Sequence, residues 1–122
     1  MTGHKKLENY ILAKPGAWLD YPFGEGTAVY KVGAKETAKM FALIKDGSYP
    51  AQISLKCDPL LAEKLREEYE TIMPGYHLSK KHWNTIIASG QLDEAYLLSL
   101  IDLSYKLVVE SLTKAEQAKL SA

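Results

Sequence analysis

The sequence predicts an α+β domain, an antiparallel sheet with helices packed on one face, in the order α-β-β-β-α-β-β-α. Two observations predict this class. Segments in which apolar and polar residues alternate, as they do in strands, are joined by short turns, and short connections favour antiparallel hairpins. Segments with apolar residues at a spacing of three to four, typical of helices, lie before, between and after those strands. Helices that are segregated from an antiparallel sheet in this way pack together on one side of it.

The first helix and three strands are predicted in the first half of the chain. Residues 4–13 have the apolar spacing of a helix, which Lys14-Pro15-Gly16 ends because proline does not continue a helix. Residues 27–32 and 51–56 alternate as strands with one apolar face. Residues 38–45 are apolar on both faces at their middle, which is typical of a central strand.

A second helix and two short strands are predicted next. Asp58-Pro59 marks a helix start, with an acidic N-cap and proline at the first helical position. An apolar stripe continues this predicted helix up to Pro74-Gly75. Residues 76–78 and 83–87 then form two short predicted strands, joined by a turn that carries two lysines.

The last two helices are predicted from their caps. Asp93 precedes the longest helix, whose apolar face continues over four turns to Leu112. The pattern Thr113-x-x-Glu116 is a capping box and predicts a short closing helix.

Length and composition indicate one globular domain spanning residues 1–122. Apolar residues make up 47% of the chain and charged residues 25%, which argues against disorder. The apolar run Tyr10–Ala13 is too short for the core of a signal peptide, and no stretch approaches the length of a membrane span. A single cysteine, Cys57, favours a reducing compartment. We therefore expect a cytoplasmic monomer without membrane association.

Cations and anions lie in different segments, although 15 basic residues balance 15 acidic ones over the whole chain. Residues 27–57 carry five lysines against two acidic residues, and residues 73–90 carry two lysines and no acid. Acidic residues exceed basic ones by five to two in residues 58–72 and by four to one in residues 91–112. Positive charge therefore belongs mostly to the predicted sheet and hairpins. The alternative is a mixed surface, because such segments can interleave in three dimensions.

The stretch Pro74–Trp83 contains two lysines, two histidines, a tyrosine and a tryptophan, without an acidic residue. Cations pair with phosphates, and flat aromatic faces stack on bases. The candidate nucleic-acid contacts in this stretch and on neighbouring strands are Lys31, Lys56, Tyr76, Lys80, Lys81 and His82. Their spacing carries no code for reading bases, so contact would be directed mostly to the backbone and sensitive to salt. The alternative is that the lysines form a solvated turn while Trp83 fills the core.

No metal or other cofactor is expected. His77 and His82 are five residues apart, a spacing that matches no zinc pattern, and the lysines beside them repel cations. Three glutamates share one face of the second predicted helix: Glu63, Glu67 and Glu70. A hard cation requires more converging oxygens than these, and Arg66 beside them can neutralise Glu70.

Catalysis is not expected either. The sequence contains no nucleophile–base signature, no glycine-rich phosphate loop and no zinc-protease motif. Cys57, at the start of the second predicted helix, is the candidate nucleophile. Burial and the neighbouring Asp58 would raise the pKa of its thiol, so we expect an inert cysteine and no enzyme.

Several short motifs follow one another at specific spacing. They are Lys14-Pro15-Gly16, Tyr21-Pro22-Phe23-Gly24, Tyr30-Lys31-Val32, Met40-Phe41-Ala42, Ser54-Leu55-Lys56-Cys57-Asp58-Pro59, Pro74 to Trp83 with Asn84-Thr85, and Ser104-Tyr105-x-Leu107-Val108. Through them the chain resembles the MmcQ/YjbR family from about Leu7 to Glu116. The resemblance implies a CyaY-like (bacterial frataxin-like) α+β domain. It also implies DNA binding by a "double wing" of two β-hairpins, and it supplies no catalytic residues.

This chain departs from the family pattern at two places. Ala88-Ser89-Gly90 lacks the acidic residue that relatives often have before the glycine, and the first hairpin turn, Gly33–Thr37, is longer and polar.

The function expected from these observations is nucleic-acid binding of modest affinity, with DNA as the expected partner. The alternative is a protein–protein interaction module or adaptor without a nucleic-acid role. It is suggested by the neutral total charge and by Phe41 and Leu43, which alternation places together on the second face of the central strand.

Overall fold

Six strands form one antiparallel sheet in the structure, a computed structural model that describes residues 2–120. The strands are β1 (Ala17–Asp20), β2 (Thr27–Val32), β3 (Lys39–Lys45), β4 (Gln52–Lys56), β5 (Ile72–Pro74) and β6 (Trp83–Ile87). Their order across the sheet is β1-β2-β3-β4-β6-β5, so β3 is a central strand as its two apolar faces predicted. Every neighbouring pair is antiparallel, which confirms the predicted class.

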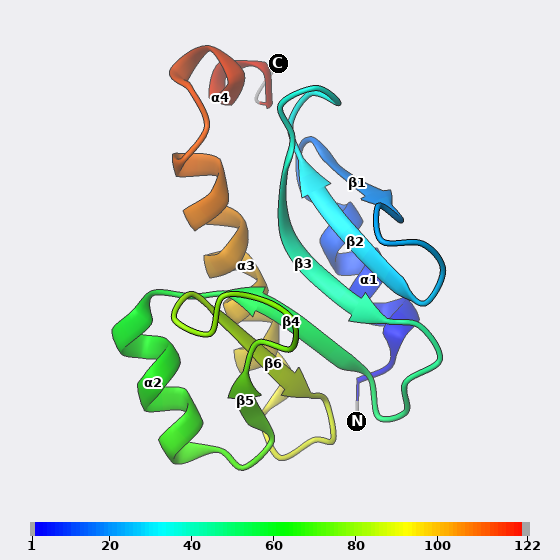
Figure 1. Ribbon diagram of the computed structural model, residues 1–122, viewed down its shortest axis with the longest axis vertical. Helices are drawn as coiled ribbons and strands as arrows, with labels where there is room; N and C mark the ends of the chain where they lie inside the picture. Colours follow the sequence, from blue (N-terminus) through cyan, green and yellow to red (C-terminus); the bar gives the residue numbers. More distant parts are fainter. Residues whose placement is uncertain (1, 121–122) are drawn as a thin grey trace.

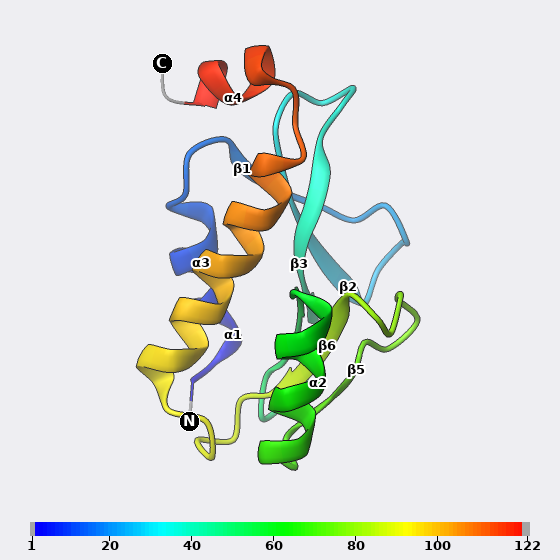
Figure 2. The same cartoon turned by 90° about the vertical axis from the view of Figure 1, so that its left-hand side faces the viewer.

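The helices lie on one side of this sheet (Figures 1 and 2). Helix α3 (Glu94–Glu110) covers the middle strands, α1 (His4–Leu12) packs beside β1 and α3, and α2 (Pro59–Glu68) packs beside β5 and β6. The short helix α4 (Lys114–Leu120) follows α3 at one end of the molecule. Within residues 2–120, no helix combines the length and the apolar character needed to cross a membrane.

The main core fills the space between the sheet and these helices. Tyr30, Ile44 and Ile53 from the strands are fully buried there against residues of α1 and α3 such as Ile11 and Ile101. A smaller cluster lies on the opposite sheet face, where Trp83 packs with Val29 and Leu43. Trp83 is 7% exposed, so its predicted burial is confirmed, although it lies outside the main core.

Two predicted caps are confirmed by their hydrogen bonds, and a third is present only in position. The Asp58 carboxylate accepts from two backbone N–H groups at the start of α2, at 3.1 and 3.4 Å. Thr113 and Glu116 form the reciprocal capping box of α4, with bonds of 3.0 and 3.1 Å. Asp93 stands at the N-cap of α3, but its side chain accepts no capping hydrogen bond.

The secondary structure differs from the prediction in a missed strand, a helix end and a falsely predicted strand. Strand β1 was not predicted, because its four residues lie between turn-forming glycines and prolines that obscure so short an alternation. Helix α2 ends at Glu68, since Tyr69 is extended (φ −128°, ψ 119°), and the apolar residues that follow pair as β5 with β6. Residues 76–78, predicted as a strand, form a turn in which His77 has a left-handed φ of 58°.

A hydroxyl of α3 replaces a hydrogen bond between β3 and β4. The ladder of these strands ends at the pair Ala42–Leu55, and the next pair in register would be Phe41 and Lys56. Instead, the fully buried Ser104 hydroxyl accepts from the Lys56 N–H at 2.9 Å and donates to the Phe41 carbonyl at 2.5 Å. The two strands diverge beyond this point (Figure 1).

Phe41 turns toward the helices at the same place. The register of β2 and β3 shifts opposite Phe41, where Tyr30 pairs with Ala42 but Lys31 pairs with Met40. The extra residue of this bulge reverses the expected alternation. The Phe41 ring is fully buried and meets Tyr105 of α3 edge-on, with centroids 5.2 Å apart. The prediction that Phe41 shares a face with Leu43 as a docking surface is therefore wrong.

Replacing Ser104 with alanine should destabilise the fold by about 1–3 kcal/mol, because a buried N–H and a buried carbonyl both lose their partner. Chemical denaturation of the variant measures this change. Ser99→Ala is the matched control on the same helix, since Ser99 is exposed and its hydroxyl bonds only the Tyr96 carbonyl. Equal unfolding free energies for the two variants would contradict the structural role of Ser104.

Candidate nucleic-acid interface

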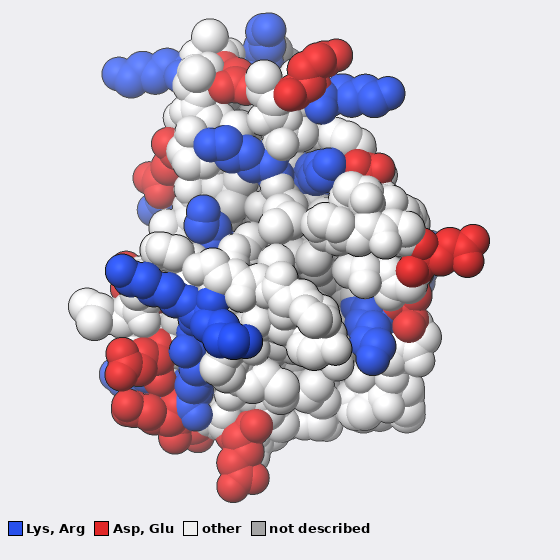
Figure 3. Space-filling model, viewed as in Figure 1, with Lys and Arg blue, Asp and Glu red and all other residues white. Residues whose placement is uncertain are grey.

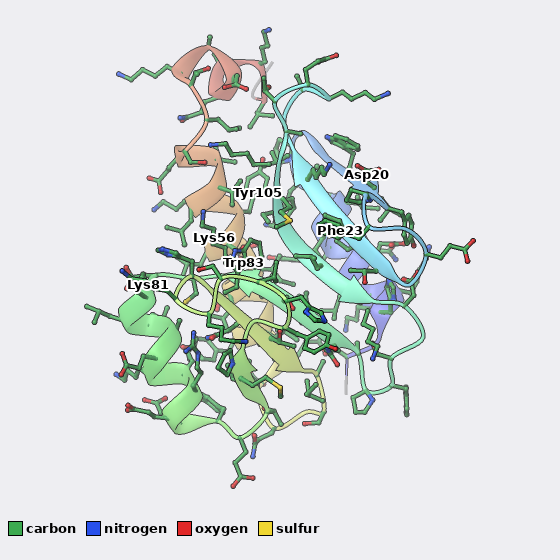
Figure 4. All side chains as sticks on the ribbon, in the orientation of Figure 1. Asp20, Phe23, Lys56, Lys81, Trp83 and Tyr105 are labelled. Carbon is green, nitrogen blue, oxygen red and sulfur yellow. The ribbon has the colours of Figure 1, made fainter. Side chains whose placement is uncertain are left out.

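The sheet face turned away from α1 and α3, here called the open face, carries the candidate residues. Residues that pair across antiparallel strands share a face, so the open face can be read from the register. It carries Trp18, Asp20, Val29, Lys31, Leu43, Ser54, Lys56, Trp83 and Thr85. Figure 4 views this face, with Phe23 on the side of β1 and β2 and with Lys56, Trp83 and Lys81 on the other side.

Residues 75–82, which connect β5 to β6, fold back over the open face. Leu78 packs onto the cluster of Trp83 and its neighbours, and the Tyr76 N–H donates to the Thr85 hydroxyl at 3.0 Å. A Cβ on Gly75 would lie 2.7 Å from the Cβ of Trp83, so only glycine allows this close approach. The loop is therefore held in a defined position on the sheet.

Arg66 of α2 fixes the same loop from the helix side. Its Nε donates to the Asn84 Oδ1 at 2.6 Å, and a terminal nitrogen donates to the Lys80 carbonyl. Asn84 is 2% exposed and donates in turn to the Ala62 carbonyl, which ties β6 to α2. The expectation that Arg66 neutralises Glu70 is wrong, because the guanidinium points toward the sheet. Sequence analysis missed this role, since the partners lie 14 and 18 residues away.

Four of the six candidate contacts come together around this loop. Lys80, Lys81 and His82 are exposed on it, and Lys56 ends β4 directly opposite Trp83. The Cys57 N–H donates to the His82 carbonyl at 2.8 Å, which joins the end of β4 to the loop. We call Lys56, Lys80 and Lys81, with Arg66 beneath them, the basic strip. Within residues 2–120, no carboxylate lies within 4.0 Å of any cation in this strip.

The other two candidates lie elsewhere. Lys31 pairs with Asp20 at 2.9 Å on the β1 side and stands 5.6 Å from the centre of the Trp18 ring. The hydrogen bonds from Lys31 and from the Tyr21 N–H hold the pKa of the Asp20 carboxyl below its ordinary value. Lys31 is thus neutralised and does not extend the basic strip. Tyr76 is 63% exposed and stands beside a groove rather than in the strip.

The surface charges are segregated locally rather than over whole faces. Blue side chains gather on the left of the open face in Figure 3, acidic ones lie below them, and the centre of the face is uncharged. Five lysines elsewhere form ion pairs: Lys5, Lys6, Lys14, Lys31 and Lys64. On the face that Figure 3 shows, the sequence pattern therefore yields a small basic area on a mixed surface, with further cations near the end of the molecule where α4 lies.

A groove of about 330 Å³ opens beside the basic strip. Its two sides are the β1–β2 loop, with Phe23, and the turn that carries Tyr76 and His77. Its floor comes from β3 and β4, including Leu43 and Ser54. Apolar walls with a few polar groups are typical of sites for small ligands or ligand moieties. No sequence motif indicated this groove.

The histidines, the acidic residues and Cys57 are the other side chains that the sequence singled out. Within residues 2–120, no three His, Cys, Asp or Glu side chains lie where they could hold a metal ion. Cys57 is buried, and this burial together with the Asp58 charge raises the pKa of its thiol to about 11. Such a thiol is a poor nucleophile at neutral pH.

The sequence is similar to a known bacterial protein family. The family model described as YjbR matches residues 12–107. "Uncharacterized protein YbdF" of Escherichia coli O157:H7 is 34% identical over 95% of this chain and 92% of its own length. "Uncharacterized protein YjbR" of Escherichia coli K12 is 32% identical over 92% of both chains. These matches cover nearly the whole domain.

Two solved structures have a similar fold. The crystal structure of Deinococcus radiodurans protein DR2400, described as a DUF419 domain, superposes with a TM-score of 0.93. It is 36% identical in sequence, and the match covers 99% of this chain and 89% of that one. A protein from Pseudomonas syringae gives a TM-score of 0.73 at 28% identity, over 88% of this chain and 99% of its own. The six-stranded α+β arrangement is therefore shared with experimental structures.

Arg66→Met should loosen residues 79–82, because the Lys80 carbonyl and the Asn84 amide lose a charged donor while the apolar stem remains. We expect faster hydrogen–deuterium exchange in this segment and a loss of about 1–3 kcal/mol in unfolding free energy. Lys64→Met on the same helix is the control, since Lys64 is exposed and pairs only with Glu68, at 3.9 Å. Unchanged exchange at residues 79–82 would show that Arg66 does not hold the loop.

Cys57 should resist alkylation in the folded protein at pH 8. A thiol whose pKa rises from 9.0 to about 11 has far less thiolate at this pH, and the thiolate is the reacting form. We expect iodoacetamide to modify the native protein about 100-fold more slowly than the urea-unfolded chain, as followed by mass spectrometry. Similar rates in the two states would mean that the thiol is neither buried nor perturbed.

Proposed function

Because this chain belongs to the YjbR family, whose relatives described above are named as uncharacterized, we propose a function from its own surface. The protein binds nucleic acid with modest affinity, mainly by contacts of the basic strip with backbone phosphates. The proposal is a binding function rather than a catalytic one.

The observation that carries this proposal is that two lysines of the basic strip, Lys80 and Lys81, lie on a loop that is held fixed. Lys80 and Lys81 lie on the loop of residues 75–82. Gly75 and Leu78 hold this loop against the sheet, and Arg66 of α2 holds it from the helix side. Cations that are free of carboxylate partners can exchange their counterions for phosphates, which favours polyanion binding. Contacts of this kind position a nucleic acid without reading its sequence.

The proposal includes the finer description that the family resemblance implied. We propose DNA as the polymer, a CyaY-like fold, and the β5–β6 hairpin as the "wing" that presents the basic strip. The description is supported by the antiparallel sheet and by the place of the β5–β6 pair at its edge. We also propose a cytoplasmic monomer, in keeping with the buried free thiol of Cys57.

A second candidate function is that of a protein–protein interaction module. It is favoured by large apolar side chains outside the groove that remain in solvent, among them Leu60, which is 80% exposed, and Tyr49, which is 82% exposed. Leu60 is on α2, and Tyr49 is in the turn between β3 and β4. Scattered apolar residues are common on protein surfaces, so this observation carries less weight than the basic strip.

Replacing both Lys80 and Lys81 with alanine should weaken DNA binding and flatten its dependence on salt. Each phosphate contact contributes about 0.9 to the slope of log affinity against log salt, so the slope should fall by about 2. Fluorescence anisotropy with labelled duplexes of about 20–30 base pairs, between about 50 and 200 mM salt, measures this change.

The matched control for this experiment is Lys114→Ala with Lys119→Ala. Both lysines are exposed on α4, at the end of the molecule away from the basic strip, and the change in net charge is the same. If the control lowers affinity and slope as much as the Lys80/Lys81 variant does, binding is general electrostatic attraction and the basic strip is not its site.

A further inference from the structure

The groove beside the basic strip has two exposed aromatic side chains on opposite sides. Phe23 is 64% exposed and Tyr76 is 63% exposed, whereas Phe41 and Trp83 are buried in the two clusters. The Tyr76 ring stands against the His77 ring, with centroids 4.0 Å apart and planes tilted by 55°. A flat ligand placed between these walls would remove apolar surface from water and stack on an aromatic face.

The Tyr76 side of this groove is held in place before any ligand arrives. The Tyr76 N–H is bonded to the Thr85 hydroxyl, which lies 2.8 Å from the buried Ser54 hydroxyl on β4. Wall and floor are thus connected by buried polar contacts. A site with a fixed wall loses less conformational entropy when it binds a ligand.

The groove also contains polar groups that suit the edge of a nucleobase. Gln52 lines it with an amide that both donates and accepts, and Lys45 lines it with a cation. Lys45 has no carboxylate within 4.0 Å among residues 2–120. Glu25, the acidic residue of the β1–β2 loop, does not line the groove. An anionic polymer with flat rings therefore complements this area in charge and in shape.

We propose that this groove receives an unpaired nucleobase, so that the protein binds single-stranded nucleic acid in preference to duplex. The inference rests on the proposed function, because the basic strip supplies the phosphate contacts. Tyr76 lines the groove and lies four residues before Lys80 on the same loop, so one short segment connects the groove to the strip. Paired bases in a duplex are stacked on one another and cannot offer their faces to Phe23 and Tyr76. Stacking on aromatic residues also tolerates any base.

The test compares a single-stranded 20-mer with a duplex of the same length, by fluorescence anisotropy at about 50 mM salt, where phosphate contacts are strong. For the unchanged protein we expect at least about tenfold tighter binding of the single strand, the effect of one base stacked on an aromatic ring. Phe23→Ala with Tyr76→Ala should lower single-strand affinity about tenfold or more and leave duplex affinity unchanged. Both residues are exposed, so thermal unfolding of this variant should match that of the unchanged protein.

Two further variants of the protein, measured in the same experiment, separate this inference from the proposed function. Leu60→Ala removes an apolar side chain outside the groove that is 80% exposed and should leave both affinities unchanged. The Lys80/Lys81 variant should weaken single strand and duplex alike. Equal binding of both polymers, with no effect of the groove substitutions, would overturn the groove inference. If binding still depends on Lys80 and Lys81 in that case, the proposed function remains supported. Absence of binding to either polymer at this salt would overturn both.

A readout without substitutions completes the test. Titration of the isotope-labelled protein with the single strand should shift the backbone amide NMR signals of Phe23, Tyr76 and His77, and the duplex should leave them in place. Shifts restricted to Lys80 and Lys81 with both polymers would overturn the inference, since contact would then stop at the basic strip.

Discussion

The Ser104 hydroxyl bridges β3 and β4 where a direct backbone hydrogen bond would otherwise join them, and much of the structure depends on this bridge. It joins the Phe41 carbonyl to the Lys56 N–H through helix α3, at the point where the two strands separate. A buried carbonyl and a buried N–H would otherwise lack partners. Phe41 can then turn inward onto Tyr105, which fixes α3 against the sheet. Lys56, just past the divergence, is positioned beside Trp83 and the loop of the basic strip.

The open face is covered in part by the loop of residues 75–82, which itself presents exposed lysines. Its middle needs burial because Val29, Leu43 and Trp83 are apolar, and Leu78 of the folded-back loop supplies part of this cover. The same loop then carries Lys80 and Lys81 at its exposed end. One segment thus closes a small apolar cluster and holds cations in a fixed position, with Arg66 anchoring it from the opposite side. Rigid support of this kind reduces the entropy lost when side chains contact a ligand.

The proposed function and the groove inference each invoke one physical effect. In the proposal, phosphate contacts supply affinity that depends on salt, and stacking in the groove would select polymers with free bases. The two effects are separable, because Phe23 and Tyr76 border the groove while the lysines follow the loop. Family membership alone does not decide between nucleic acid and protein as the partner, since one fold serves many functions. The arrangement of side chains on the open face is what favours nucleic acid.

Local patterns in the sequence determined the α+β class, the central position of β3, the caps of α2 and α4, and the family. Each of these depends on residues close together in the chain, so spacing and residue type suffice to predict it. Lys56, Lys80 and Lys81 were named from the sequence as candidates, but their common location depends on the pairing of β4 with β6, which are not consecutive in the chain. Only the tertiary structure decided that Arg66 bonds Asn84, that Lys31 pairs with Asp20, and that Phe23 and Tyr76 line one groove. It also decided that α2 gives way to β5, because pairing with β6 outweighs an apolar stripe that suits either structure. These features depend on contacts between residues far apart in the chain, which no local pattern records.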